Sequence, residues 1–288
     1  MLRTRTLSTA AHTLIMGVLN VTPDSFSDGG VHANSAAAVA RGLAMAAAGA
    51  DIVDVGGEST KPGADPVGTG EELERVVPVV AELAAAGIVV SVDTMKPEVA
   101  TAAVAAGAEI INDVGGLRDP AMVEIVAALE AGVVIMHMRG EPRTMQAETA
   151  YGDVVDEVRD YLEAQAGKAV AAGIERNRIA IDPGIGFGKS HLQNLEILNR
   201  SVDFISQGFP VVIGASRKGF LGSVLAASGR ETVAAERDAA TSATVTAAII
   251  GGASVVRVHD VARAHEVART TDAIVRGQFE DRDTIGGT

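Results

Sequence analysis

The 288-residue chain contains no cysteine. Disulfide bonds, zinc–thiolate sites and thiol nucleophiles are therefore excluded. No segment reaches the roughly 18 uninterrupted apolar residues that predict a membrane-spanning helix, and residues 1–12 lack the apolar stretch of a secretory signal. We therefore expect a cytoplasmic protein that does not act on membranes.

Positive charge is scarce as well. Lys and Arg number 24 against 37 Asp and Glu, which gives a formal net charge of −13. This balance argues against a nucleic-acid partner, because such partners are bound by neutralising phosphates. It leaves open a small anionic substrate in a local basic pocket. Hydrophobic residues make up 47% of the chain and charged residues 21%, so a large core is expected and disorder is not.

One local pattern recurs along the chain: an Ala-rich amphipathic segment ends at a glycine and is followed by a short β-branched run. Glycine adopts the left-handed conformation just past a helix without steric cost. The glycines in this position are Gly49, Gly87, Gly107, Gly132, Gly173, Gly208 and Gly252. With an opening strand added, the predicted strands cover residues 13–20, 51–55, 88–92, 109–113, 133–137, 178–182, 210–214 and 254–258.

Helix starts support the same division. Thr69 with Glu72 predicts a capping box, Asp119 followed by Pro120 predicts a helix start, and Asp260 is expected to cap the last helix. Strands that alternate with helices predict a parallel sheet. Eight such units in a chain of this length favour one closed (β/α)₈ TIM barrel over the alternative, an open doubly wound sheet. We expect an N-terminal extension over 1–12, the barrel over 13–276 and a frayed tail over 277–288.

Each predicted strand ends in polar or ionisable residues, and in such barrels the chemistry lies at these ends. Helix caps alone would supply Asp, Asn and Ser, but cations are unfavourable at helix N-termini. Lys218, Arg257 and His259 therefore indicate a ligand. The strand-end residues are Asn20, Glu58 to Thr60, Asp93, Asn112, His137, Asp182, Ser216 to Lys218, Arg257 and His259.

Two kinds of chemistry are expected among these residues. Asp93, Asn112 and Asp182 offer acceptors, and a flat heterocycle with an amino group beside a ring N–H satisfies one carboxylate with two parallel hydrogen bonds. Lys218 can donate to a carbonyl oxygen on the same ring.

The second kind of chemistry is anion binding. Arg257 and His259 are two apart on one strand and can share a face. Together with Asn20 they predict a site for an anion such as a diphosphate with a divalent metal, because Mg²⁺ accepts an amide oxygen and keeps water and phosphate ligands.

Two long, turn-rich loops, 21–34 and 59–68, flank this mouth and are expected to act as lids; a surface insertion without a role is the alternative. The segment Gly184-Ile-Gly-Phe-Gly-Lys-Ser190 superficially resembles a phosphate-binding P-loop. That motif requires a glycine where Pro183 stands. We interpret the segment as a place where backbone approaches a ligand, with Phe187 as an apolar wall.

Eight segments, in order and between about residues 14 and 260, resemble the signatures of the dihydropteroate synthase family. The two long ones are Gly17-Val-Leu-Asn-Val-Thr-Pro-Asp-Ser-Phe-Ser-Asp-Gly-Gly30 and Asp54-Val-Gly-Gly-Glu-Ser-Thr-Lys-Pro-Gly-Ala64. The others are Ser91–Thr94, Ile111–Val114, Met136–Met138, Asp182–Phe187, Gly214–Lys218 and Arg257–Asp260.

This resemblance implies an enzyme of folate synthesis. Its reaction would join 6-hydroxymethyl-7,8-dihydropterin diphosphate and p-aminobenzoate into dihydropteroate, with release of pyrophosphate. It also implies a Mg²⁺ cofactor, a p-aminobenzoate site of the kind that sulfonamides occupy in the family, and a homodimer.

Site residues follow from the resemblance by position. The pterin would be held by Asp93, Asn112, Met138, Asp182, Lys218 and Arg257. The diphosphate would lie near Asn20, Thr60, Arg257 and His259, with Asn20 as the Mg²⁺ ligand. The p-aminobenzoate site would comprise Phe26, Asp28, Thr60, Lys61, Pro62, Phe187, Lys218 and Gly219. The catalytic set would be Asn20, Asp93, Asp182, Lys218, Arg257 and His259.

Two positions depart from the family's usual pattern. Lys61 stands where arginine is common, which keeps the charge and loses planar bidentate geometry. Gly219 stands where serine or arginine is frequent. Two rival functions remain: a cobalamin-type methyltransferase domain, against which the diphosphate residues argue, and a catalytically silent pterin-binding paralogue.

Overall fold

The structure is a computed structural model that describes residues 2, 5–22, 30–61, 63–147 and 149–277, with the side chains of 30–34 outside the description. Eight parallel strands follow one another around a barrel in the order β6-β5-β4-β3-β2-β1-β8-β7. They are β1 (Leu14–Asn20), β2 (Ile52–Gly56), β3 (Val90–Asp93), β4 (Ile110–Asp113), β5 (Gly132–Met136), β6 (Ile179–Asp182), β7 (Val212–Ile213) and β8 (Val255–Val258).

The sheet closes between its two end strands. Ile181 of β6 forms a parallel bridge with Val211, the residue before β7, and the Ile181 amide donates to the Pro210 carbonyl at 2.9 Å. The predicted (β/α)₈ barrel is confirmed, and the open doubly wound alternative is excluded by this closing bridge.

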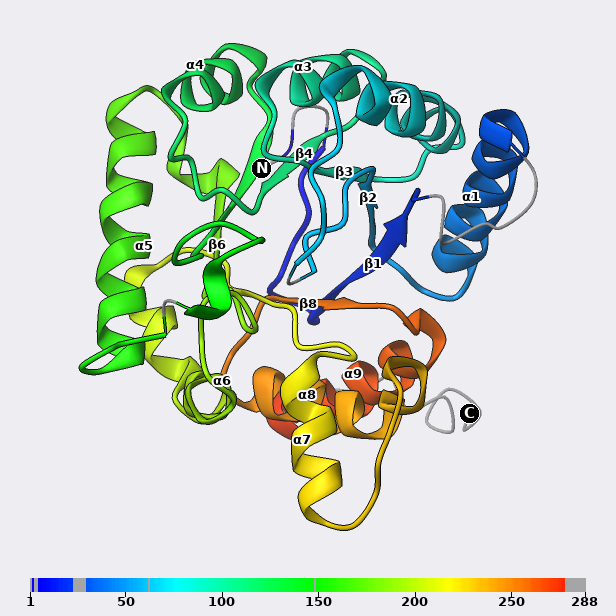
Figure 1. Ribbon diagram of the computed structural model, residues 1–288. Coiled ribbons are helices and arrows are strands. Elements are labelled where there is room, and N and C mark those ends of the chain that lie inside the picture. The colour runs from blue at the N-terminus through cyan, green and yellow to red at the C-terminus, as the bar shows by residue number, and fades with distance from the viewer. Residues whose placement is uncertain (1, 3–4, 23–29, 62, 148, 278–288) are drawn as a thin grey trace, which may run out of the picture.

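Helices surround the strands on all sides (Figure 1). They are α1 (Gly30–Ala47), α2 (Thr69–Ala85), α3 (Pro97–Ala105), α4 (Pro120–Leu129), α5 (Val154–Ala171), α6 (His191–Asn199), α7 (Gly219–Ala227), α8 (Asp238–Ile250) and α9 (Val261–Arg276). A 3₁₀ helix, η4 (Ser201–Gln207), follows α6, and β7 is followed by two helices, α7 and α8, where one was expected. Because α1 begins at Gly30, the first loop is shorter than the predicted 21–34.

Most local signals at helix ends are confirmed. Six of the seven glycines that were expected to terminate helices have positive φ, with Gly132 as the exception. Glu130 takes the left-handed position instead, and Gly132 begins β5. Asp119 and Asp260 cap their helices as predicted.

The capping box at Thr69 was wrong. The N-cap of α2 is Gly68, without a side-chain hydrogen bond. The physical reason is that the Glu72 carboxylate is fully buried and pairs with Lys96 of the next βα unit. It is therefore not available to the start of its own helix.

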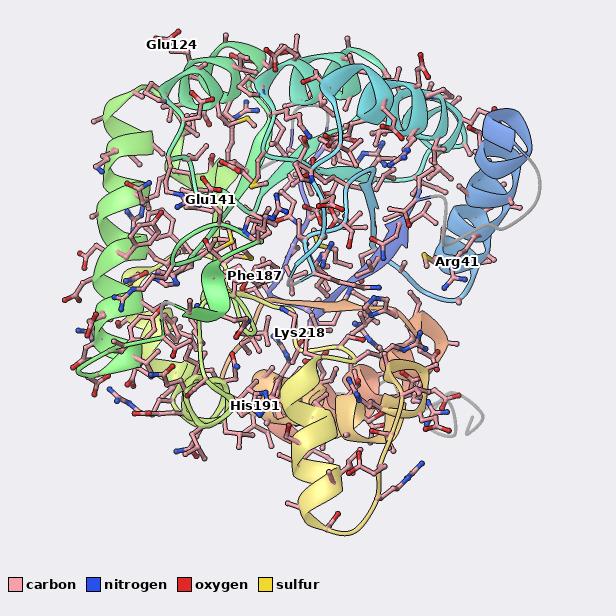
Figure 2. All side chains as sticks on the ribbon, in the orientation of Figure 1. Arg41, Glu124, Glu141, Phe187, His191 and Lys218 are labelled. Carbon is pink, nitrogen blue, oxygen red and sulfur yellow. The ribbon has the colours of Figure 1, made fainter. Side chains whose placement is uncertain are left out.

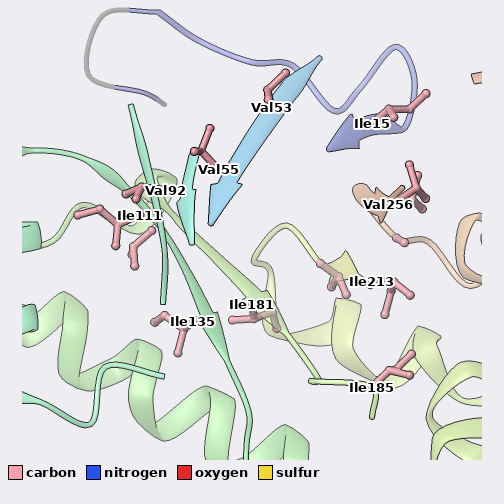
Figure 3. Close-up of a cluster of buried hydrophobic side chains, with 14 of the residues drawn as sticks. Ile15, Val53, Val55, Val92, Ile111, Ile135, Ile181, Ile185, Ile213 and Val256 are labelled. Atoms are coloured by element: carbon pink, nitrogen blue, oxygen red, sulfur yellow. The ribbon is translucent and has the colours of Figure 1, made fainter. Parts of the chain in front are cut away.

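Successive side chains of each strand point alternately outward and inward, and this separates two apolar layers. Side chains that point outward pack under the helices, and Figure 3 shows Val53, Val55, Ile111, Ile135 and their neighbours in this layer. Side chains that point inward at the amino ends form a second, smaller cluster: Leu14, Met16, Ile52, Val89, Ile110, Val134, Val212 and Val255. The barrel interior is thus filled, as expected for eight strands.

The amino end of the barrel is closed by the beginning of the chain. Leu2 is 8% exposed and belongs to the interior cluster. Arg5 pairs with the buried Glu109 at 2.8 Å and donates to the Gly87 carbonyl at 3.1 Å. Residues of the predicted N-terminal extension therefore contact the barrel. Among the described residues, no helix combines the length and apolarity needed to cross a membrane.

Candidate active site

Inward-facing positions change from apolar to polar along several of the strands. Two residues after the apolar layer come Asp54, Ser91, Asn112 and Arg257, and Asp93 and Asp182 end their strands. The adjacent strands are in register here, with Gly56 beside Asp93 and Asp93 beside Asn112. The carboxyl end of the barrel therefore carries a layer of charged side chains over an apolar floor.

Arg257 is the centre of this layer. Its Nε donates to Asp54 Oδ2 at 2.7 Å and its Nη2 donates to Asp93 Oδ2 at 2.6 Å. Asn112 Nδ2 donates to the same Asp54 oxygen at 3.0 Å. The resemblance places Asp54 in a family signature but implies no role for it. A charged residue inside the otherwise apolar strand Ile-Val-Asp-Val-Gly was the signal that could have identified it.

Two carboxylate oxygens of this layer have no partner among the described residues: Asp54 Oδ1 and Asp93 Oδ1 are buried without a hydrogen bond. A buried acceptor left unpaired costs about 1–3 kcal/mol or more. Such atoms are expected where a ligand supplies the donors.

Glycines leave room beside these carboxylates. A Cβ on Gly56 would lie 3.7 Å from Asp93 Oδ2 and 3.8 Å from Asn20 Oδ1, and one on Gly214 would lie 3.9 Å from Asp182 Oδ2. Neither glycine has a side chain to fill the volume beside these carboxylates. Asn20, at the end of β1, borders the same space.

Asp182, Lys218 and Phe187 form the next part of the site. Asp182 Oδ1 accepts from the Gly184 amide at 2.7 Å. Lys218 Nζ donates to the Ile185 carbonyl and lies 4.5 Å from the centre of the Phe187 ring. Figure 2 shows Lys218 and Phe187 close together over the barrel, far from Arg41 and Glu124 on the outer helices.

His259 follows β8 and contacts Ser216, which follows β7. Ser216 Oγ lies 3.0 Å from His259 Nδ1 and accepts from the His259 amide at 3.3 Å. Because Oγ then has its own proton to donate to Nδ1, the arrangement favours the tautomer with the proton on Nε2. His259 can therefore act as a neutral hydrogen-bond donor.

Burial and mutual charge shift the pKa values in this layer. Burial raises the pKa of Asp93 to about 7, although Arg257 lowers it. It also raises the pKa of Asp182, against the opposing effect of Lys218. Burial lowers the pKa of Lys218 to about 8. Perturbed pKa values of this kind gather at functional sites.

The opposite side of the mouth is cationic. The pKa of His259 is lowered to about 3, first by burial and then by the charges of Arg257, Arg217, Lys218 and Lys61. These cations surround one histidine in a chain whose formal net charge is −13. The local field therefore favours an anion. This agrees with the local basic pocket for a small anionic substrate that the overall negative charge left open.

Two further contacts support the site: Glu58 and Arg217 were among the predicted strand-end residues, whereas their partners Lys96 and Asp238 were not predicted. Lys96 donates to Glu58 at the start of the loop after β2 and to the fully buried Glu72 of α2. Arg217, with a left-handed φ of 60°, holds Asp238 of α8 through two bonds of 2.7 and 2.8 Å. Both contacts join residues far apart in sequence, and no local pattern indicates them.

The remaining predicted site residues differ in burial and position. Met138 is buried and packs in one apolar cluster with Val114, Met136, Met145 and Phe187. Thr60 is half-buried and Lys61 is exposed in the loop after β2. Gly219 begins α7 with open space around it. Phe26, Asp28 and Pro62 lie outside the described residues.

Comparisons with known proteins agree with this geometry. The model of a family described as pterin binding enzyme matches residues 16–259. A dihydropteroate synthase of Mycobacterium leprae is 51% identical over 253 residues, which are 86% of this chain and 88% of that protein.

Solved structures give the same result. A Yersinia pestis dihydropteroate synthase in complex with a sulfonamide drug is 38% identical, with a TM-score of 0.89 over 96% of this chain and 99% of that one. A Xanthomonas albilineans dihydropteroate synthase in complex with 7,8-dihydropteroate is 42% identical, with a TM-score of 0.82 over 93% and 95%. Fold and site together are those of a pterin-binding barrel enzyme. The chain belongs to the dihydropteroate synthase family.

Proposed function

We propose that this chain condenses 6-hydroxymethyl-7,8-dihydropterin diphosphate with p-aminobenzoate to give 7,8-dihydropteroate and pyrophosphate. The observation that carries the proposal is the pair of buried carboxylates at strand ends, Asp93 and Asp182, with one Asp93 oxygen unpaired among the described residues. A pterin presents an amino group and ring N–H groups that such acceptors can bind.

The pterin is held by the polar layer and the apolar cluster beneath it. Asp93, Asn112 and Asp182 accept from the ring, and Lys218 donates to the ring carbonyl. Met138 lines the apolar side. Arg257 is already oriented by Asp54 and Asp93, so its guanidinium can lie over the ring while a free edge faces the diphosphate.

The diphosphate occupies the cationic side of the mouth. Arg257 and the Nε2–H of neutral His259 donate to its oxygens, with Thr60 at the edge of the loop after β2. This placement puts the leaving group among the cations that surround His259, where the negative charge that develops on departure is stabilised.

Magnesium fits this side if most of its ligands are water and phosphate oxygens. The described residues contain no group of three His, Cys, Asp or Glu that could hold a metal. The amide oxygen of Asn20 borders the site, and Mg²⁺ needs few protein ligands because it keeps water and phosphate oxygens. We therefore assign Asn20 as its protein ligand. When bound, the ion would neutralise charge on the departing pyrophosphate.

The p-aminobenzoate site lies above the pterin. Phe187 offers a wall, Lys218 a cation and Gly219 open space. The two loops contribute Thr60 and Lys61, together with Phe26, Asp28 and Pro62, which lie outside the described residues. Sulfonamides would compete for this position.

The reaction is a displacement at the pterin methylene carbon. The amine nitrogen of p-aminobenzoate forms the new C–N bond while the C–O bond to the diphosphate breaks, and the amine proton passes to solvent. Because an aryl amine is neutral near pH 7, no strong general base is required. The protein contributes orientation of the two substrates and stabilisation of the leaving group.

The experiment that tests this proposal is direct. Purified protein with both substrates and Mg²⁺ should release pyrophosphate and form dihydropteroate, and omission of either substrate should abolish both products. Pterin binding without product in the complete mixture would instead identify a silent paralogue. Methyl transfer with a methylated pterin would identify the methyltransferase alternative, which the cations around His259 do not favour.

We further propose a cytoplasmic homodimer whose subunits meet through outer helices. Exposed apolar side chains on α6, η4 and α8 support this, with Leu192 at 78%, Val202 at 59% and Ile250 at 64% exposure. Ile250→Glu should shift the mass measured by light scattering to that of a monomer. A wild-type protein that is monomeric at micromolar concentration would contradict the dimer.

A further inference from the structure

Lys189 is a fully buried lysine next to the active site, and the proposed chemistry does not use it. It lies between β6 and α6 and is 1% exposed. Its Nζ is 2.9 Å from His137 Nδ1, 2.9 Å from the Gly184 carbonyl oxygen and 3.0 Å from the Phe187 carbonyl oxygen. These contacts fill the amine's hydrogen-bonding positions, so Lys189 does not act as the lysine of a phosphate-binding loop.

Two protonation arrangements satisfy these three contacts. In one, an ammonium donates to both carbonyls and to His137 Nδ1. In the other, a neutral amine donates to both carbonyls and accepts from His137 Nδ1–H. Burial lowers the pKa of Lys189 well below its usual range. In both arrangements the two backbone carbonyls are bound, so the contact to the loop does not depend on the charge.

The segment that Lys189 binds has little regular structure of its own. Gly184, Gly186 and Gly188 all have positive φ, and one backbone bond, from the Phe187 amide to the Gly184 carbonyl at 3.0 Å, closes the turn. Lys189 binds that same Gly184 oxygen and the carbonyl of Phe187. Its amine therefore ties the two ends of the turn together and, through His137, ties them to the end of β5.

This turn also carries three contacts of the active site. The Gly184 amide donates to Asp182, the Ile185 carbonyl accepts from Lys218, and the Phe187 ring lies against Lys218. A shift of the turn would therefore change the pterin acceptor, the orientation of Lys218 and the wall of the p-aminobenzoate site together.

We propose that Lys189 is a positioning residue for the condensation: it fixes the turn between Gly184 and Phe187 and thereby sets Phe187 and Lys218 against the substrates. This inference rests on the proposed function, because it concerns the residues assigned there to p-aminobenzoate. It assigns Lys189 no contact with either substrate.

The chain's composition allows a clean test, because it contains no cysteine. In Lys189→Cys the introduced thiol is the one thiol present, and in the unfolded chain it displaces bromide from 2-bromoethylamine. The product, S-(2-aminoethyl)cysteine, restores an amine at nearly the length of lysine. After refolding, Lys189→Met and Lys189→Cys should raise KM for p-aminobenzoate about 10-fold or more, with a smaller change in kcat. They should also shift the alkaline limb of kcat/KM that Lys218 sets.

Chemical restoration and a stability control separate positioning from simple destabilisation. The aminoethylated protein should return to within about threefold of wild type, whereas the iodoacetamide product, which ends in a neutral amide, should not. Asp272→Asn, at the other end of the barrel, should lower the melting temperature and leave both KM values unchanged. Lys189→Met with wild-type KM values and an unmoved alkaline limb would overturn the proposal, as would failure of aminoethylation to restore KM.

A second readout does not need activity. The chain contains no tryptophan, so Phe187→Trp places a single reporter on the turn. Adding Lys189→Met, or Lys189→Gln if the methionine variant does not fold, should shift its emission to longer wavelength and at least double its quenching by acrylamide. Unchanged emission would overturn the proposal. A wild-type protein that forms no dihydropteroate would instead refute the proposed function and leave this fluorescence result to decide the role of Lys189.

Discussion

Two buried aspartates at opposite ends of the barrel differ in how completely their carboxylates are hydrogen-bonded. At the amino end, Asp272 accepts from the Thr13 amide and hydroxyl at 2.8 Å each and from Arg276 at 3.0 Å, so both of its oxygens are bound. At the carboxyl end, Asp93 binds Arg257 through one oxygen while the other has no partner among the described residues. The barrel thus has a satisfied structural carboxylate, on α9, at its amino end and an incompletely satisfied one, on β3, at its carboxyl end.

This difference teaches where the function lies. A carboxylate whose partners are all supplied by the chain stabilises the fold, whereas one left unpaired in a buried layer is prepared for donors from a ligand. Substitutions at the two ends should therefore separate stability from substrate binding.

Asp182→Asn should give the largest effect. The amide presents an NH₂ group toward ring donors and removes a charged acceptor, so two favourable hydrogen bonds become unfavourable contacts. Affinity for the dihydropterin diphosphate should fall about 100-fold or more, measured by calorimetric titration. Pterin affinity equal to that of wild type would refute the assignment of the pocket.

The pH dependence of kcat/KM for the pterin substrate should be bell-shaped. The pKa of Asp93 is raised to about 7, so below that pH the carboxyl is protonated and loses acceptor capacity, and the rate falls as pH falls. The pKa of Lys218 is lowered to about 8, so above that pH the amine loses its proton and the rate falls as pH rises. Each limb should approach a tenfold change per pH unit.

Asp93→Asn should remove the acidic limb of this profile and leave the alkaline one. A wild-type profile that is flat between about pH 6 and pH 9 would contradict the roles of both groups. The same profile measured for Asp272→Asn should retain both limbs, since that carboxylate lies at the other end of the barrel.

Asp272→Asn should destabilise the fold without touching the site. It weakens charge-assisted bonds to Thr13 and Arg276, worth about 1–3 kcal/mol, so the melting temperature should fall by several degrees. Thermal denaturation followed by circular dichroism measures this, and steady-state kinetics at 20 °C should show unchanged KM values. A changed KM in this variant would mean that the two ends are not independent.

Lys61→Ala should give the smallest effect. This exposed cation contributes to the positive side of the mouth near His259, and exposed charges contribute about 1 kcal/mol or less. KM for p-aminobenzoate should rise about two- to fivefold, while pterin affinity stays within twofold. An effect on pterin affinity alone would contradict the placement of Lys61.

The fold was predictable because its signals are local and repeated. Glycines after helices, caps such as Asp119 and the strand-end polar residues each reflect a few neighbouring residues, and eight repetitions compensate for a single error such as Gly132. The Thr69 capping box failed because Glu72 is committed to Lys96, a contact between two different βα units.

The partners within the site were less predictable than its members. Strand ends identify Asp93, Asp182 and Arg257, but periodicity does not show that Arg257 binds Asp54 and Asp93. In sequence, Lys189 belongs only to a segment that superficially resembles a phosphate-binding loop, and its bonds to two backbone carbonyls become apparent only when β5 and β6 lie side by side. Contacts across the barrel depend on closure, which a single strand's sequence does not encode.

The central claim is that the polar layer at the carboxyl end is the pterin pocket, and a crystal structure with bound 6-hydroxymethylpterin tests it most directly. The account predicts the ring in the space beside Gly56 and Gly214, with its donors on Asp93 and Asp182 and Asp93 Oδ1 bonded. A ring bound elsewhere, with Asp93 Oδ1 still unpaired, would contradict it.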